Sequence, residues 1–328
     1  MKKGDITMKK TLIIIACIVL VAALSTACFM GCTNDKPVIG IIQFATHGSL
    51  NNCYTGIIEG LKEGGIDLDA YEIEYVNSNT SPETSLAQAQ KMVNEKAKII
   101  IAIANQSAID AGTAAAGTGI PVVYDAVSDV SNLNNFDNIT GVCDLCPFED
   151  QLKLVTAFFG RDNLKIGVLM STEEDSDELQ LRTLQAAAAA YTGMTIESRT
   201  IADITTITTV TQALVDSNID CIVNLLDNTI VKNLTEILAV TNAANIPVFG
   251  SEVEQVRDGC LASASIDYIT VGKLAGLQAA KILSGTAIED VAPQTMEGNS
   301  QPFYNESVAT ALNIAIPTYE GLTKVTAR

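Results

Sequence analysis

After Pro37 the hydrophobic residues fall into short apolar runs that alternate with stretches of helical periodicity. The runs are rich in isoleucine and valine, which is typical of strands buried on both faces. Strands are predicted at 38–44, 71–76, 98–104, 120–124, 165–170, 195–200, 221–226 and 246–249, and helices at 50–64, 81–95, 108–117, 177–191, 207–216, 228–243 and 271–283. Alternation of this kind predicts an α/β protein with parallel sheets covered by helices on both sides.

The two halves of the chain repeat the same pattern. Residues 120–123 (IPVV) and 246–249 (IPVF) each follow a helix and a short turn, and each leads into a polar loop. This repeat predicts two doubly wound parallel-sheet lobes. Ligands of such sheets bind at the carboxyl ends of the strands, so two facing lobes would share one ligand cleft.

The first 32 residues have the pattern of a secretion signal. Four lysines precede an apolar run at 12–23, and small residues and cysteines follow it. The segment resembles the lipobox of bacterial lipoproteins, with Cys32 favoured as the lipidated residue, because Gly31 precedes it and a polar tether follows at 33–36. Cys28 is the alternative lipidation site, and an uncleaved anchor helix at 12–30 is a second interpretation. All three interpretations of this segment place the globular part outside the cytoplasmic membrane. Lipidation would anchor it to the bacterial cell membrane.

The composition of the chain argues against several classes of partner and site. The 20 Lys and Arg against 38 Asp and Glu give a net charge of −18, which argues against nucleic acid as a partner. Removal of residues 1–32 takes away four lysines and Asp5, a net +3, and leaves −21. The chain has one histidine, His47, and no tryptophan. A site with two histidines is excluded, and no phosphate-binding glycine motif is present. We therefore expect no catalytic residues, no metal and no cofactor.

Five cysteines follow the signal segment. Cys53, Cys221 and Cys260 lie in apolar surroundings and are predicted to be small buried residues. Cys143 and Cys146 have the spacing of a redox or metal pair, but one such pair supplies only two ligands. A disulfide between them and a pair of free thiols both remain open.

Polar loops follow six of the predicted strands and contain no lysine or arginine. They are 45–49, 105–107, 125–129, 171–174, 227–229 and 251–252. Several of their residues could act only as helix N-caps. As a ligand site, the loops suit an ammonium group beside Asp125, Asp227 or Glu252, with a ligand carboxylate held by hydroxyls and helix N-terminal amides. In the acidic run 173–178, Glu173 is expected to face the ligand.

These loops and their flanking strands carry a family resemblance. The sequence resembles the tryptophan/tyrosine-type substrate-binding lipoproteins of ABC transporters at 39–50 (IGIIQFATHGSL), 100–107 (IIAIANQS), 121–129 (PVVYDAVSD), 138–142 (NITGV), 227–229 (DNT), 247–252 (PVFGSE) and 266–272 (IDYITVG). The resemblance implies a type I periplasmic-binding-protein fold with two lobes joined by a multi-strand hinge. Carried over by position, the cleft would be lined by Thr46, His47, Asn105, Gln106, Ser107, Asp125, Ser128, Ser171, Glu173, Asp227, Asn228, Ser251 and Glu252.

The resemblance also implies an organisation and a function. We expect an N-terminal lobe of residues 37–142 and 267–290 and a C-terminal lobe of 143–266 and 291–328. The expected function is that of a monomeric extracytoplasmic receptor of an ABC importer, which captures a small amphoteric ligand, an aromatic amino acid above all, by hinge closure and delivers it to a permease and ATPase. The alternatives are a ligand-sensing domain that feeds a signalling partner and a receptor for a sugar or another metabolite.

Overall fold

The computed structural model describes residues 36–174, 176–296 and 298–327. Residues 38–328 form one compact unit. The predicted signal segment, with its candidate lipidation sites Cys28 and Cys32, lies outside the described residues. Within the described ranges, no helix combines the length and the apolar character that crossing a bilayer requires.

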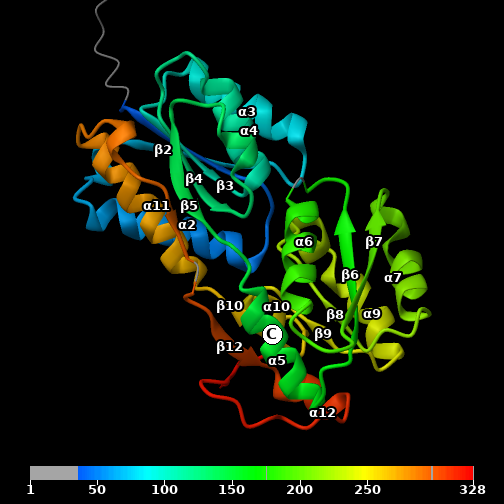
Figure 1. Cartoon of the computed structure of the whole chain (residues 1–328). Coiled ribbons are helices and arrows are strands. Elements are labelled where there is room, and N and C mark those ends of the chain that lie inside the picture. Colours follow the sequence, from blue (N-terminus) through cyan, green and yellow to red (C-terminus); the bar gives the residue numbers. More distant parts are fainter. Residues whose placement is uncertain (1–35, 175, 297, 328) are drawn as a thin grey trace, which may run out of the picture. The chain divides into compact units, whose positions relative to one another are not determined.

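The first sheet is parallel throughout, with strand order β11-β5-β4-β3-β1-β2. In Figure 1 the strands of this sheet lie beside the helices of the first lobe. The strands are β1 (Val38–Gln43), β2 (Glu72–Asn77), β3 (Ile99–Ile103), β4 (Val122–Val127), β5 (Ile139–Cys143) and β11 (Gln294–Thr295). The helices are α2 (Gly48–Glu63), α3 (Pro82–Asn94), α4 (Asn105–Ala115) and α11 (Tyr268–Leu283), and the turns are η1 (Leu68–Ala70), η2 (Ser131–Leu133) and η4 (Ile288–Asp290).

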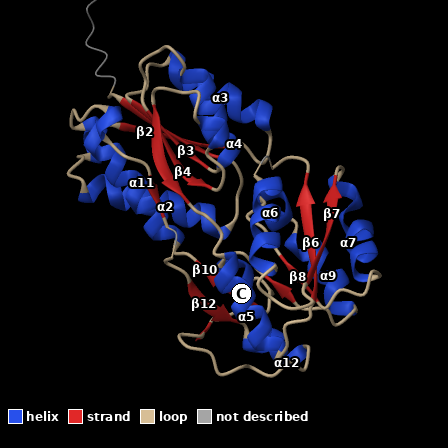
Figure 2. Cartoon of the chain, in the orientation of Figure 1, coloured by secondary structure: helices blue, strands red, loops and turns tan. Residues whose placement is uncertain are grey.

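The second sheet has the order β13-β12-β10-β9-β8-β6-β7, and β12 runs antiparallel to β10. Figure 2 shows its strands among the helices of the second lobe. The strands are β6 (Lys165–Ser171), β7 (Thr195–Ile201), β8 (Cys221–Val223), β9 (Val248–Phe249), β10 (Ala262–Ser265), β12 (Gln301–Tyr304) and β13 (Thr323–Lys324). The helices are α5 (Phe148–Phe159), α6 (Asp177–Ala188), α7 (Ile207–Val215), α8 (Asn228–Lys232), α9 (Leu234–Ala243), α10 (Val253–Arg257) and α12 (Glu306–Ala311), with the 3-10 turn η3 (Ile204–Thr206).

Each sheet has a hydrophobic core on both faces. In β3, Ile99 and Ile101 belong to the cluster under α2 and α11, whereas Ile100 packs in the cluster with α3 and α4. In the second sheet, Val223 and Ile222 are likewise divided between two clusters. Successive side chains of a strand point to opposite faces, so a strand that is covered on both sides must be apolar throughout. The predicted α/β fold with two doubly wound lobes is confirmed.

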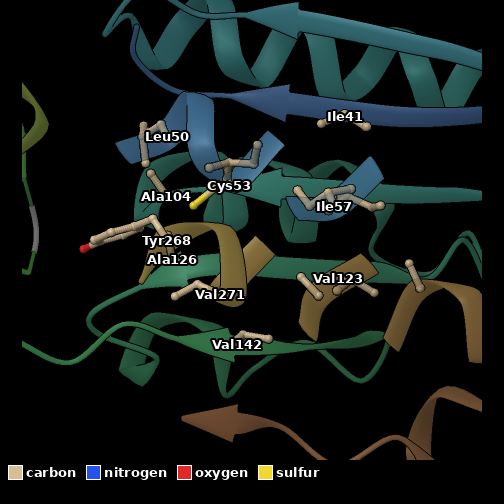
Figure 3. Close-up of a cluster of buried hydrophobic side chains, with 14 of the residues drawn as sticks. Ile41, Leu50, Cys53, Ile57, Ala104, Val123, Ala126, Val142, Tyr268 and Val271 are labelled. Carbon is tan, nitrogen blue, oxygen red and sulfur yellow. The ribbon is translucent and has the colours of Figure 1, made fainter. Parts of the chain in front are cut away.

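Helices α2 and α11 form the tightest contact in the first lobe, although two hundred residues separate them (Figure 1). A Cβ added to Gly272 would lie 2.0 Å from the Cys53 carbonyl oxygen, and one added to Gly56 would lie 2.1 Å from that of Ile269. Only glycine permits such an approach of two backbones. Figure 3 shows the neighbouring core, with Cys53 and Val271 inside it and the Tyr268 hydroxyl directed away from the other labelled side chains.

The chain crosses between the sheets three times: after β5, between β10 and α11, and between β11 and β12. The third crossing lies after Thr295, whereas the lobe boundary was expected at residue 290. The reason is that Gln294 and Thr295 pair with β5 in the first sheet. That boundary therefore moves beyond Thr295. All eight predicted strands and seven predicted helices overlap observed elements, except that the helix expected at 228–243 is divided into α8 and α9.

Candidate functional site

A small cavity lies at the carboxyl ends of strands from both sheets. Its volume is about 20 Å³, and its walls are His47, Leu50, Ala104, Asn105, Ala126, Ser128, Asp144, Leu226, Asp227, Asn228, Val231, Glu252 and Tyr268. This volume admits a water molecule, whereas sites for small-molecule ligands usually enclose about 300–1,000 Å³. A ligand as large as an amino acid would require the walls to move apart.

A larger hollow of about 680 Å³ shares three wall residues with the cavity: His47, Val231 and Glu252. Its other walls are polar and include Thr46, Asn52, Lys232, Glu254 and Asp258. The shared residues therefore separate the cavity from the outer part of the cleft.

His47 reaches from the first lobe to two loops of the second. Its Nε2 lies 2.9 Å from Asn228 Oδ1, and its Nδ1 lies 3.6 Å from Glu252 Oε1. Asn228 begins α8 after β8, and Glu252 precedes α10 after β9. A further contact between the lobes joins Lys232 Nζ to Thr80 Oγ1 at 3.2 Å. These polar contacts hold the two sides of the cleft together.

Asn105 and the alanines around it connect the loops after β3 and β4. Its Oδ1 accepts hydrogen bonds from the backbone N–H groups of Ser128 (3.0 Å) and Asp129 (3.2 Å). Ala104 and Ala126, which line the cavity, have φ values of 82° and 53°. A left-handed conformation is strained for alanine, and such strain is typical of functional sites.

Asp144 lies in the first crossing between the lobes, directly after β5, and is 4% exposed. Its Oδ1 accepts a hydrogen bond from the Ser128 hydroxyl (2.9 Å), and its Oδ2 accepts one from the Tyr268 hydroxyl (3.0 Å). Burial raises the pKa of Asp144 to about 7, the two hydroxyl donors oppose this rise, and the nearby Glu252 carboxylate adds to it. Asp144 and Glu252 therefore place two carboxyl groups at the same cavity.

Asp227 has a largely structural role at the cavity wall. Its Oδ1 accepts from the N–H groups of Thr229 (2.8 Å) and Ile230 (2.9 Å), which caps α8, and its Oδ2 accepts from the Ser171 N–H (2.7 Å). Asp177 lies beside it and accepts from the same Ser171 N–H at 3.1 Å. Burial and the adjacent Asp227 raise the pKa of Asp177 well above its ordinary value.

Asp125 is buried and does not line the cavity. It is 0% exposed, and neither of its carboxyl oxygens has a hydrogen-bond partner within normal distance. Burial raises its pKa to about 8, and the neighbouring Cys53 thiol opposes the rise. Asp125 is absent from the walls of both the cavity and the outer hollow.

The structure divides the thirteen predicted cleft residues into three groups. Six line the cavity: His47, Asn105, Ser128, Asp227, Asn228 and Glu252. Thr46 lines the outer hollow. The other six lie outside both walls: Gln106, Ser107, Asp125, Ser171, Glu173 and Ser251.

Three of the residues outside both walls form local hydrogen bonds. Gln106 donates to Asp110 Oδ1 (3.0 Å), and the Ser251 hydroxyl donates to the Leu225 carbonyl (2.9 Å). Glu173 is exposed and accepts from the Thr229 hydroxyl (3.1 Å), whereas the next residue, Glu174, is buried and bonds Asn228.

Sequence reasoning missed Asp144 and Tyr268 as cavity residues. The signals for them were an acidic residue after the strand at 139–143 and a tyrosine within the 266–272 stretch of the resemblance.

Cys143 and Cys146 are free cysteines in the structure, as are Cys53, Cys221 and Cys260. The Cys143 thiol lies 3.9 Å from the Tyr124 hydroxyl, and Cys146 packs at the edge of the core around α5. Of the two states that the sequence leaves open, the structure contains the free thiols. Among the described residues, no group of three or more histidine, cysteine, aspartate or glutamate side chains is arranged to hold a metal ion.

Comparison with known proteins identifies the family. Residues 38–325 match the model of the family described as ABC transporter substrate binding protein. The chain is 30% identical over 286 residues to the tyrosine-binding protein of Clostridioides difficile (strain R20291), an alignment that covers 84% of this chain and 81% of the relative.

Two solved structures share the fold at 26% identity, and each comparison covers 89% of this chain and 100% of the other. The structure of the ABC domain in complex with L-Trp from Streptococcus pneumonia has a TM-score of 0.82. The ligand-free, open structure of a substrate-binding protein with adhesive properties from Clostridium difficile has a TM-score of 0.67. The arrangement of the chain is thus more similar to the tryptophan complex than to the open form. With a family match across both lobes and a cavity between their strand ends, the chain belongs to the extracytoplasmic substrate-binding proteins of ABC transporters.

Proposed function

We propose that the protein captures a small amphoteric ligand, an aromatic amino acid above all, in the cavity between its lobes. The observation that carries this proposal is the chemistry of the cavity wall, which combines buried carboxylates with apolar side chains and contains no lysine or arginine. Asp144 and Glu252 are 4% and 2% exposed. Burial of two carboxylates without a counter-charge is costly, and a ligand ammonium between them would offset that cost.

The apolar part of the wall suits the side chain of an aromatic amino acid. Leu50, Leu226, Val231 and the ring of Tyr268 line the same cavity as the carboxylates. Large apolar ligand groups bind to walls of this kind, while a few polar groups fix their orientation. The tyrosine-binding relative and the tryptophan-bound structure support the same ligand class.

Capture proceeds by closure of the lobes about the three crossings. The ligand bridges the lobes and shifts the population to the closed arrangement, because it binds that arrangement more tightly. The small cavity and the greater similarity to the tryptophan complex than to the open structure support this mechanism. The closed receptor then delivers its ligand to the permease and ATPase of an importer, with no chemical step of its own.

Isothermal titration of the purified chain tests the ligand class. The ligands are L-tyrosine, L-tryptophan, tyramine, which lacks the carboxylate, and 3-(4-hydroxyphenyl)propionate, which lacks the ammonium. We expect L-tyrosine or L-tryptophan to bind, tyramine to bind more weakly, and the propionate to give no heat. Absence of heat with both amino acids, or binding of the propionate as tight as that of L-tyrosine, would contradict the proposal.

We also propose that the receptor is a monomer tethered to the membrane by a lipid on Cys32, with Cys28 as the alternative. The support is the order of basic, apolar and small residues before each cysteine. Metabolic labelling with a fatty-acid analogue should label the wild-type protein and not Cys32→Ser. If Cys28→Ser alone removes the label, the lipid is on Cys28, and if neither substitution does, the anchor is not a lipid on these cysteines.

A further inference from the structure

Two alanines of the cavity wall have backbone conformations that favour glycine. Ala104, which precedes α4, has φ 82° and ψ 161°, a region that is occupied almost exclusively by glycine. Ala126 has a φ of 53°, in the left-handed region. Each conformation is less favourable for alanine than for glycine, so the chain carries backbone strain at two positions of one wall.

The two alanines lie at the carboxyl ends of the neighbouring strands β3 and β4. The Ala104 N–H donates to the Asp125 carbonyl at 2.9 Å, which links the two positions through the backbone. The register between β4 and β5 shifts between Tyr124 and Val127, where β4 advances three residues and β5 advances two. Such an extra residue is a β-bulge, and bulges beside functional sites redirect a side chain. Both alanines therefore line the cavity from irregular positions at the ends of their strands.

One methyl group is all that distinguishes alanine from glycine at these positions. Ala104 and Ala126 belong to the buried hydrophobic cluster that contains Leu50 and Tyr268, and all four residues line the cavity. In Figure 3 the two alanines lie beside these larger side chains. Core packing alone does not require a strained backbone, because Ala102, two residues earlier in the same strand, is fully buried in an ordinary strand conformation.

We propose that Ala104 and Ala126 determine which ligand side chain the site accepts: their methyl groups contact the apolar part of the bound ligand, and their strained backbones hold those methyl groups at the cavity. Each methyl group adds dispersion contacts with the ligand and occupies space that a larger ring would need. The inference rests on the proposed function, because it concerns the side chain of the captured amino acid. Recognition of the ligand ammonium by Asp144 and Glu252 is a separate matter.

Three alanine-to-glycine variants of the full chain, purified in detergent, test this assignment. The urea midpoints of Ala104→Gly and Ala126→Gly should equal or exceed that of the wild type, because the relief of backbone strain offsets the lost burial of one methyl group. Ala102→Gly is the matched control, since it removes the same group from an unstrained, fully buried position outside both walls. It should lower the urea midpoint and leave ligand binding unchanged.

Isothermal titration with L-tyrosine and L-tryptophan gives the binding result. Each of the two cavity variants, Ala104→Gly and Ala126→Gly, should bind L-tyrosine about fourfold more weakly than the wild type does, which is the effect of one buried methyl group. The affinity for L-tryptophan should fall less, because its larger ring fills the space that the methyl group leaves. The preference between the two amino acids should therefore shift towards L-tryptophan.

Three results would overturn the assignment: wild-type affinity for L-tyrosine in both cavity variants, equal losses for the two amino acids, or a urea midpoint that falls as far in Ala104→Gly as in Ala102→Gly. The wild type itself separates this inference from the proposed function. If it binds L-tryptophan and not L-tyrosine, the inference fails and the proposed ligand class stands. If it binds neither amino acid, both fail.

Discussion

The contact between α2 and α11 and the cleft at the ends of the same helices differ in almost every physical respect. Along the helix pair, backbones touch through glycines, and a Cβ at Gly272 would lie 2.0 Å from the Cys53 carbonyl oxygen. At the cleft, the residue that precedes α2 is His47 and the first residue of α11 is Tyr268, and both line a cavity with buried carboxylates. The packing of the two helices stabilises the first lobe. It also places His47 and Tyr268 at the cavity, where buried polar groups cost stability but are available to bind a ligand.

The largest effect should come from filling the helix contact. Gly272→Val places side-chain atoms against the backbone of α2, which cannot move without displacing the helix, and should lower the free energy of unfolding by about 4 kcal/mol. Gly285→Ala is the control, because no atom lies within 4 Å of the added Cβ and only its φ of 100° is unfavourable. It should cost about 1 kcal/mol. Urea denaturation measures the free energy of unfolding of both variants. Equal losses in Gly272→Val and Gly285→Ala would show that close packing is not the reason for glycine at position 272.

The second prediction concerns the carboxylates behind the cleft. Because the pKa of Asp177 is raised in the folded state, the protein holds a proton there that the unfolded chain releases above about pH 4. The stability that depends on this proton is complete at low pH and is lost as the pH rises. Asp177→Asn cannot ionise, so it should be about 2 kcal/mol more stable than the wild type at pH 8.

The same pair should have similar stabilities at pH 4.5, and urea denaturation at the two pH values measures the difference. The exposed Asp203→Asn variant is the control. A stability difference between Asp177→Asn and the wild type that does not grow with pH would show that the carboxyl group is ionised in the folded protein.

Binding should respond to Glu252 more than stability does. Glu252→Gln keeps the shape of the side chain and removes the charge beside the cavity, so affinity for an amino-acid ligand should fall by about 10–30-fold. Glu173→Gln is a matched control, since Glu173 is exposed and lies outside the wall. If Glu173→Gln weakens the binding of L-tyrosine as much as Glu252→Gln does, the ligand ammonium does not lie at Glu252.

The smallest effect is expected at the crossing between the lobes. Tyr268→Phe removes the donor to Asp144 Oδ2 and should reduce the free energy of unfolding by about 1 kcal/mol. Because the lost hydrogen bond stabilises the carboxylate, the pKa of Asp144 should rise further above 7. A carbonyl-region difference spectrum across pH 6–9 would detect that rise, and an unchanged titration would contradict the role given to the hydroxyl group.

Much of the fold followed from the sequence, because strands covered on both faces are recognisable as apolar runs. Two of the elements that the prediction missed lack that signal. The strand β10 (Ala262–Ser265) consists of alanine and serine, and α10 has only five residues. The return of Gln294 to the first sheet depends on a two-residue pairing with β5, which no periodicity reveals.

Five of the six predicted polar loops contribute a residue to the cavity or the outer hollow, and the loop at 171–174 does not. Some residues of a loop that follows a strand face the cavity, whereas others cap a helix or form local hydrogen bonds. The sequence does not distinguish these two groups of residues. Ser251 and Gln106 form local hydrogen bonds, and burial falls on Glu174 and not on Glu173. Asp144 lines the cavity from a crossing between the lobes, and its one sequence signal is its position directly after the strand at 139–143.

A crystal structure of the protein with L-tyrosine would show where the ligand binds and which way its charged groups face. We expect the ligand between the two sheets, with its ammonium nitrogen about 3 Å from the carboxylate oxygens of Asp144 and Glu252 and its ring against Leu50, Leu226 and Val231. A ligand carboxylate facing Asp144 and Glu252, or a tyrosine bound outside this cleft, would contradict the account.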